Sequence, residues 1–170
     1  MVVNPEHAMR FSGKETKRRS GILMAMVELP EELKQLKRFH GHLGPFVVIG
    51  YRMGAIARKK LEGKMEAIVF TGTKVPLSCI VDGVQFSSSC TLGKGNISIQ
   101  EKDEAQAHFV NDRYLVEIKL RADVRQRIES TCTRDLEEVM ALGLFSEPDA
   151  ALFNITSVET TPFERTVKLR

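Results

Sequence analysis

Several features of secreted and membrane proteins are missing from this 170-residue sequence. No apolar run approaches the roughly 20 residues that a membrane-spanning helix needs. The N-terminus lacks the charged, apolar and small-residue order of a secretory signal. The three cysteines, an odd number, do not suit a disulfide framework. We therefore expect reduced thiols, a cytoplasmic location and no membrane partner.

The signatures of several common sites are also absent. No Cys-x-x-Cys pair occurs, which excludes a four-cysteine zinc ribbon. A Walker A loop would need glycine in place of Ser88 and Ser or Thr in place of Gly95. The glycine fingerprint of dinucleotide-binding folds and the His-Glu-x-x-His zinc helix do not occur. Any active chemistry therefore depends on other combinations of residues.

The net charge of +3 is confined to the first twenty residues. That segment has five basic and two acidic side chains, whereas residues 21–170 have equal numbers of each. We predict that residues 1–24 form a mobile basic arm and that residues 25–170 form a single domain. Because the domain is neutral overall, its composition gives no reason to expect nucleic-acid binding.

Hydrophobic spacing predicts two helices in the first part of this domain. One is expected to open at Pro30, and the other runs from Pro45 with an apolar stripe that reaches Leu61. Gly50 and Gly54 lie on one face of the second helix. Since an interior glycine costs about 1 kcal/mol relative to alanine, we expect this face to pack closely against another backbone.

The rest of the sequence predicts an α+β domain. Strands are expected at residues 66–70, 96–100, 105–110, 114–121 and 153–158, with a short helix over about 78–88 and one or two closing helices that end at Gly143. No regular βαβ repeat is present, which disfavours a doubly wound parallel sheet. We expect a mostly antiparallel or mixed sheet with helices packed on one face.

His40-Gly41-His42 is the first candidate for chemistry. Alternating positions place two imidazoles on one side of an extended segment, and imidazole is the commonest metal ligand. The alternative is a pair of surface histidines in a turn. Cys79 and Asp82 share a face of the short predicted helix. Asp82 either orients a ligand histidine or is a capping or exposed carboxylate.

A small-residue loop follows that helix and contains Cys90. Thiolates and imidazoles together suit zinc, whereas free cysteines also pack as small hydrophobic side chains. Lys94, between Gly93 and Gly95, either helps the loop bind an anion or is a solvated side chain in a glycine turn. Cys132 is expected at a helix start and has no recognisable partner, which favours a structural role.

Two motifs in this order resemble the FmdE family of formylmethanofuran dehydrogenase proteins. They are Phe39–Pro45 with Ile49–Gly54, and Cys79–Gln85 with Ser89–Asn96. The resemblance implies an α+β domain that commonly forms homodimers and often binds a metal, usually zinc. Gly44 stands where the family motif usually has a cysteine. The sequence also contains no cysteine-rich zinc ribbon of the kind found at the C-terminus of many members.

The resemblance implies that the metal ligands are His40, His42, Cys79 and Cys90. We expect a metal-binding accessory or stand-alone protein, associated with one-carbon metabolism, that holds zinc or another divalent transition metal. Asp82, Gly93, Lys94 and Gly95 are the expected contacts for a small anionic or pterin-like ligand. The alternative is a small enzyme that uses a metal-bound water or a cysteine thiolate on a small-molecule substrate.

Overall fold

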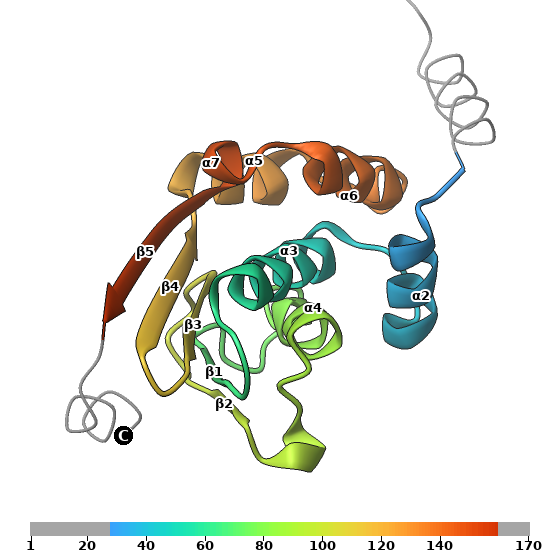
Figure 1. The fold of residues 1–170 in the computed structure, drawn as a ribbon. Helices are drawn as coiled ribbons and strands as arrows, with labels where there is room; N and C mark the ends of the chain where they lie inside the picture. Colours follow the sequence, from blue (N-terminus) through green and yellow to red (C-terminus); the bar gives the residue numbers. More distant parts are fainter. Residues whose placement is uncertain (1–27, 160–170) are drawn as a thin grey trace, which may run out of the picture. The chain divides into compact units, whose positions relative to one another are not determined.

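The computed structural model describes residues 28–159 (Figure 1). The predicted arm, residues 1–24, lies outside them. The elements are α2 (Glu31–His40), α3 (Pro45–Lys60), β1 (Glu66–Val69), α4 (Cys79–Ser88), the 3₁₀ turn η1 (Leu92–Lys94), β2 (Ile97–Ile99), β3 (Gln106–Val110), β4 (Tyr114–Leu120), α5 (Ala122–Thr131), α6 (Glu137–Ser146), α7 (Asp149–Leu152) and β5 (Phe153–Glu159). In this described part, no helix is both long and apolar enough to cross a bilayer.

The five strands form one mixed sheet in the order β2-β1-β3-β4-β5. β1 and β2 are parallel, and the other neighbouring strands are antiparallel. α3 and α4 lie against one face of the sheet (Figure 1). Ala107, Phe109 and Ile118, which alternate along β3 and β4, are completely buried. The predicted α+β fold is therefore confirmed.

Glycines let α3 and α4 pack backbone against backbone. A Cβ atom at Gly50 would lie 2.0 Å from the carbonyl oxygen of Ile80, and one at Gly54 would lie 2.1 Å from the hydroxyl of Ser87. Gly83 makes the same approach from α4 toward the backbone of α3. The predicted close packing at Gly50 and Gly54 is confirmed, and it fixes where α4 lies along α3.

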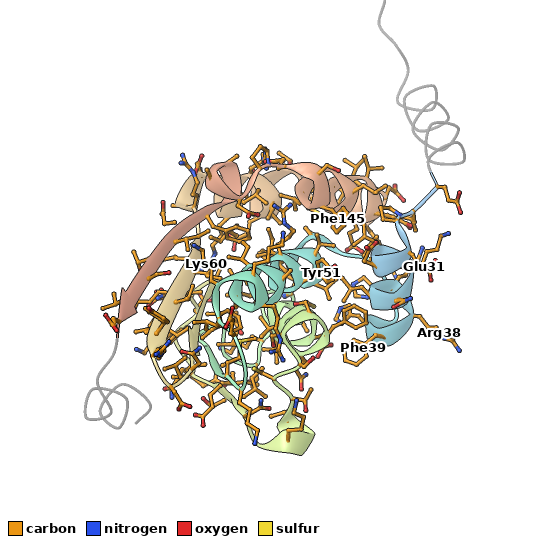
Figure 2. All side chains as sticks on the ribbon, in the orientation of Figure 1. Glu31, Arg38, Phe39, Tyr51, Lys60 and Phe145 are labelled. Atoms are coloured by element: carbon orange, nitrogen blue, oxygen red, sulfur yellow. The ribbon has the colours of Figure 1, made fainter. Side chains whose placement is uncertain are left out.

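A row of aromatic rings connects α2 with α4, α3 and α6. Phe39 lies 5.7 Å from Phe86, Phe86 lies 6.1 Å from Tyr51, and Tyr51 lies 5.9 Å from Phe145, measured between ring centroids. Figure 2 shows Tyr51 between Phe39 and Phe145. Because Phe39 contacts α4, the residue that follows it, His40, is held beside the same helix.

The structure corrects two predictions about helix ends. Gly143 lies inside α6, which continues to Ser146 and is capped by Glu147. Cys132 is the C-cap of α5 and does not open a helix. Cys132 was misplaced because a turn over residues 133–136 separates α5 from α6. Gly143 was misplaced because an arginine from another helix stabilises the end of α6.

That arginine is Arg52 of α3, whose side chain is 13% exposed. Its guanidinium donates to the carbonyl oxygens of Leu144, Phe145 and Glu147 and pairs with the carboxylate of Asp149. Carbonyl groups at a helix C-terminus have no partner within the helix. Arg52 supplies that partner from another element, so α6 needs no glycine cap.

Candidate functional site

His40 and His42 lie side by side at the junction between α2 and α3. Their ring centroids are 4.7 Å apart. His40 is the last residue of α2, and Gly41 has a φ of +96°, a conformation that favours glycine. The imidazoles are neighbours, as their spacing predicts, but the expected extended segment is wrong. A helix end followed by a left-handed glycine brings the rings together.

Asp82 of α4 contacts His40 from one side. Its Oδ2 atom lies 2.7 Å from Nδ1 of His40, and its Oδ1 atom accepts a hydrogen bond from Gln85 at 3.4 Å. The His40 side chain is only 9% exposed, and its Nε2 atom is buried with no hydrogen-bond partner. A carboxylate at Nδ1 favours the tautomer that carries its proton there, which leaves the lone pair on Nε2. His40 therefore presents an unused basic nitrogen.

A pocket of about 220 Å³ opens beside His42. Pro45, Phe46 and Val47, at the start of α3, are buried residues that line it. The other walls come from α4, α5, α6 and the loop before α4. The lining residues are His42, Gly44, Pro45, Phe46, Val47, Pro76, Cys79, Ile128, Glu129, Cys132 and Glu137.

Two thiols and two carboxylates supply much of the polar chemistry of this pocket. Burial raises the pKa of the Cys79 thiol, and the charges of Asp82 and Glu137 raise it further. Burial likewise raises the pKa of Cys132, and Glu137 again adds to the effect. Both cysteines are therefore mainly protonated near neutral pH. Glu129 also lines the pocket, and none of its lining residues in the described part of the chain is a lysine or arginine, so the pocket favours positive charge.

Cys90 lies apart from this group. It is completely buried, and its thiol donates to the carbonyl oxygen of Met65 at 3.4 Å. Cys79 opens α4, whereas Cys90 follows its far end, and a helix of ten residues is about 15 Å long. Thiolates that share a tetrahedral zinc ion lie about 4 Å apart, given zinc–sulfur bonds of about 2.3 Å. The structure thus does not bring Cys90 together with the histidine pair.

The loop predicted to hold an anion, residues 91–96, has several of its polar groups bound to other groups of the chain. The ammonium of Lys94 donates to the carbonyl oxygen of Ser89. The backbone N–H groups of Lys94 and Gly95 donate to carbonyl groups of the same loop. Gly93 and Gly95 face open space. The Ser89 contact occupies only one of the three N–H donors of the exposed Lys94 ammonium, so it does not by itself exclude an anion.

Across residues 28–159, no three His, Cys, Asp or Glu side chains are arranged to hold a metal ion. Sequence reasoning identified the imidazoles, the thiol of Cys79 and the carboxylate of Asp82, which the fold gathers near one end of α4. It missed Cys132 and Glu137 as pocket residues. Their only signal was their residue type, because they belong to the closing helices and reach the pocket only through tertiary packing.

Comparison with known proteins places this geometry in a family. Residues 39–161 match the family described as "FmdE, Molybdenum formylmethanofuran dehydrogenase operon". A protein of Archaeoglobus fulgidus described as "Probable S-adenosyl-L-methionine-binding protein" is 37% identical over 75 residues. That match covers 41% of this chain and only 20% of the relative, so the chain spans about a fifth of that protein's length.

A solved structure shares the fold. It is a tungsten formylmethanofuran dehydrogenase FmdE-like protein from Syntrophus aciditrophicus, with a TM-score of 0.59 and 23% sequence identity. The similarity covers 79% of this chain and 73% of that one. The family match includes most of the chain. It contains the histidine pair, Asp82 and all of the residues that line the pocket, from His42 to Glu137. The chain therefore belongs to the FmdE family.

Proposed function

We propose that this protein is a metal-binding member of the FmdE family, acting as an accessory or stand-alone protein, with its metal site at the histidine pair. The observation that carries the proposal is the state of His40. Its Nδ1 atom is held by the Asp82 carboxylate, while its Nε2 atom is buried and has no partner. Metal-bound histidines typically donate their other ring N–H to a carboxylate in this way.

The side chains around His40 fit a zinc-type ion. His42 supplies a second imidazole 4.7 Å away, between ring centroids, and Cys79 supplies a thiol on the wall of the adjoining pocket. Imidazole nitrogen and cysteine sulfur are the donors that zinc prefers. When bound, such an ion acts as a Lewis acid and lowers the pKa of a water molecule that it holds.

The chain's own residues have separate parts in this proposal. Asp82 keeps the proton on Nδ1 of His40 and so keeps Nε2 available as a donor of electrons. Gln85 donates to the other oxygen of Asp82 and restricts its orientation. His42 is exposed to solvent and lines the adjoining pocket, so its imidazole is accessible to an incoming ion. Because the pKa of Cys79 is raised, its thiol is a weak nucleophile at neutral pH, and it would have to lose its proton to bind a metal ion.

Elemental analysis of the full-length protein, purified without a histidine tag, tests the proposal. We expect about one equivalent of a divalent transition metal, as in a single zinc site, and loss of most of it in the His40→Ala variant. His108→Ala is the matched control, because His108 also lies near a carboxylate, with its Nε2 atom 3.5 Å from Glu117, but lies on β3. Metal far below one equivalent in the unmodified protein after reconstitution with Zn²⁺ would rule the site out.

A second candidate function is binding of a sulfonium compound in the pocket. It is favoured by the pocket's charge, since Glu129 and Glu137 line it and none of its described lining residues is a lysine or arginine. The description of the Archaeoglobus fulgidus relative also names S-adenosyl-L-methionine. Calorimetric titration with S-adenosyl-L-methionine, and with S-adenosylhomocysteine as the control that lacks the sulfonium charge, distinguishes charge recognition from recognition of the adenosyl group. Equal affinity for both compounds would contradict this candidate.

A further inference from the structure

Cys132 is a second thiol in the pocket beside the histidine pair. It is the C-cap of α5, whereas Cys79 opens α4, so the two cysteines reach the pocket from different helices. Both line the pocket together with His42. We propose that Cys132 is a further metal ligand in this protein and joins Cys79 as the second thiolate of the site. This inference rests on the proposed function, because it assigns one more residue to the same metal centre.

The Cys132 thiol is not engaged in another role. Its sulfur lies 4.0 Å from the carbonyl oxygen of Thr133, at the limit of a hydrogen bond, and the residue is only partly buried. Cys90 is the contrasting case, since it is completely buried and donates to Met65 at 3.4 Å. Rotation of the Cys132 side chain toward the pocket therefore breaks no substantial contact.

Gly44 leaves room for this rotation. A Cβ atom at position 44 would lie 3.3 Å from Nε2 of His42, so a side chain there would occupy the space beside that nitrogen. With glycine at this position, the Nε2 edge of His42 is open to the pocket that both cysteines line. A thiol from α5 can thus approach the imidazole from a side that a larger residue would block.

Binding of a divalent ion by two thiols exchanges protons for metal–sulfur bonds and requires no oxidant. Cys79 and Cys132 would each give up one proton to solvent on binding the ion as thiolates, so two metal–sulfur bonds would form for two protons released. Because no three potential ligands converge in the described residues, binding has to draw the thiols toward His42 by side-chain rotation. Cys79 and Cys132 line the same pocket together with the carboxylate of Glu137.

Titration of the metal-free, untagged full chain with Co²⁺ alone tests this inference. Thiolate-to-cobalt charge-transfer absorption grows with the number of bound thiolates. We expect about half of the unmodified protein's intensity from Cys132→Ser and from Cys79→Ser, since each keeps one of two thiolates. Cys90→Ser is the matched control and should keep the full intensity. Circular dichroism shows that each variant is folded.

The outcomes separate this inference from the proposed function. If the unmodified protein binds Co²⁺ and Cys132→Ser keeps the full intensity, Cys132 is not a ligand, while the metal site stands. If the unmodified protein binds no Co²⁺, the proposed metal site fails and this inference fails with it. Proton release measured in weakly buffered solution is a second readout, and it should fall from about two protons to about one in Cys132→Ser.

Discussion

At the scale of single residues, Asp82 influences both the imidazole and the thiol of the candidate site. Its carboxylate lies 2.7 Å from Nδ1 of His40, and its charge contributes to the raised pKa of Cys79. The Asp82→Asn variant keeps the shape of the side chain and removes the charge. We expect metal affinity to fall by roughly 10- to 100-fold, the usual effect of losing a carboxylate that orients a metal-bound histidine.

The same variant should make Cys79 more reactive. Loss of the negative charge lowers the pKa of the thiol toward its ordinary value, so a larger fraction is thiolate at any given pH below that pKa. Alkylation of the metal-free protein, followed by peptide mass spectrometry, measures this effect residue by residue. Asp123→Asn is the control, because Asp123 pairs with Arg121 on the surface. Unchanged metal affinity and unchanged Cys79 labelling would contradict this role of Asp82.

At the scale of secondary-structure elements, the contact between α3 and α4 depends on glycine, which has no side chain, at position 50. A Cβ atom at Gly50 would lie 2.0 Å from the carbonyl oxygen of Ile80, a backbone atom that cannot rotate away. We expect Gly50→Ala to destabilise the fold by about 1–3 kcal/mol or more, because the helices must separate. Chemical denaturation measures the change in the free energy of unfolding.

Gly143→Ala is the matched control for that experiment. Gly143 also lies inside a helix, α6, but a Cβ atom there would meet nothing within 4 Å. Alanine at this position should therefore stabilise the protein by about 0.5–1 kcal/mol, through helix propensity alone. A similar loss of stability in both variants would mean that the helix contact is not the reason for glycine at position 50.

The sequence predicted elements better than it predicted where they meet. Period-two alternation identified β4, and helical spacing identified α3 and its close-packed glycines, because these patterns arise from local geometry. The end of α6 was misplaced since Arg52, from another helix, supplies its capping contacts. Cys132 was likewise not placed in the pocket, because it reaches the pocket only through the packing of distant helices. Asp82 was considered as a partner for a histidine because a carboxylate commonly orients a metal-bound imidazole.

At the scale of the whole molecule, the candidate site uses almost every helix. The histidine pair lies at the C-terminal end of α2, and the first residues of α3 line the pocket. Cys79 opens α4, and Cys132 and Glu137 come from the junction of α5 and α6. A change in how the closing helices pack therefore reaches the pocket directly. A partner that binds the outer surface of α6 would therefore also affect the pocket, which Glu137 of α6 lines.

Helix α6 is largely apolar, yet only Ala141 and Leu144 are buried within one chain. Leu136 and Val139 are each 39% exposed, and both line a second groove of about 220 Å³ with Met140. Residues at positions 136, 139 and 140 form a stripe on one side of the helix. An apolar stripe of this kind is typical of a surface that packs against another chain.

We expect a second copy of this chain to cover the stripe. Arg134 precedes it, and Glu147 follows it at the rim of the groove, where it pairs with Arg127 at 2.8 Å. Two α6 helices that pack antiparallel around a two-fold axis bring the Arg134 end of each against the Glu147 end of the other. Arg134 of each copy then approaches the Arg127–Glu147 ion pair of the other, so the same groups meet at both ends of the apolar contact.

Light scattering coupled to size-exclusion chromatography measures the predicted homodimer. Leu136→Glu places a charge on the stripe and should shift the protein to the monomer, without loss of folding, because an acidic residue is favourable at a helix N-terminus. Leu92→Glu is the control, since Leu92 is 61% exposed on η1, away from α6. If the unmodified protein is a dimer and both variants remain dimers, another surface forms the contact. A monomeric unmodified protein would show that the stripe does not drive self-association, and the exposed apolar face of α6 would then have to be explained by a different partner.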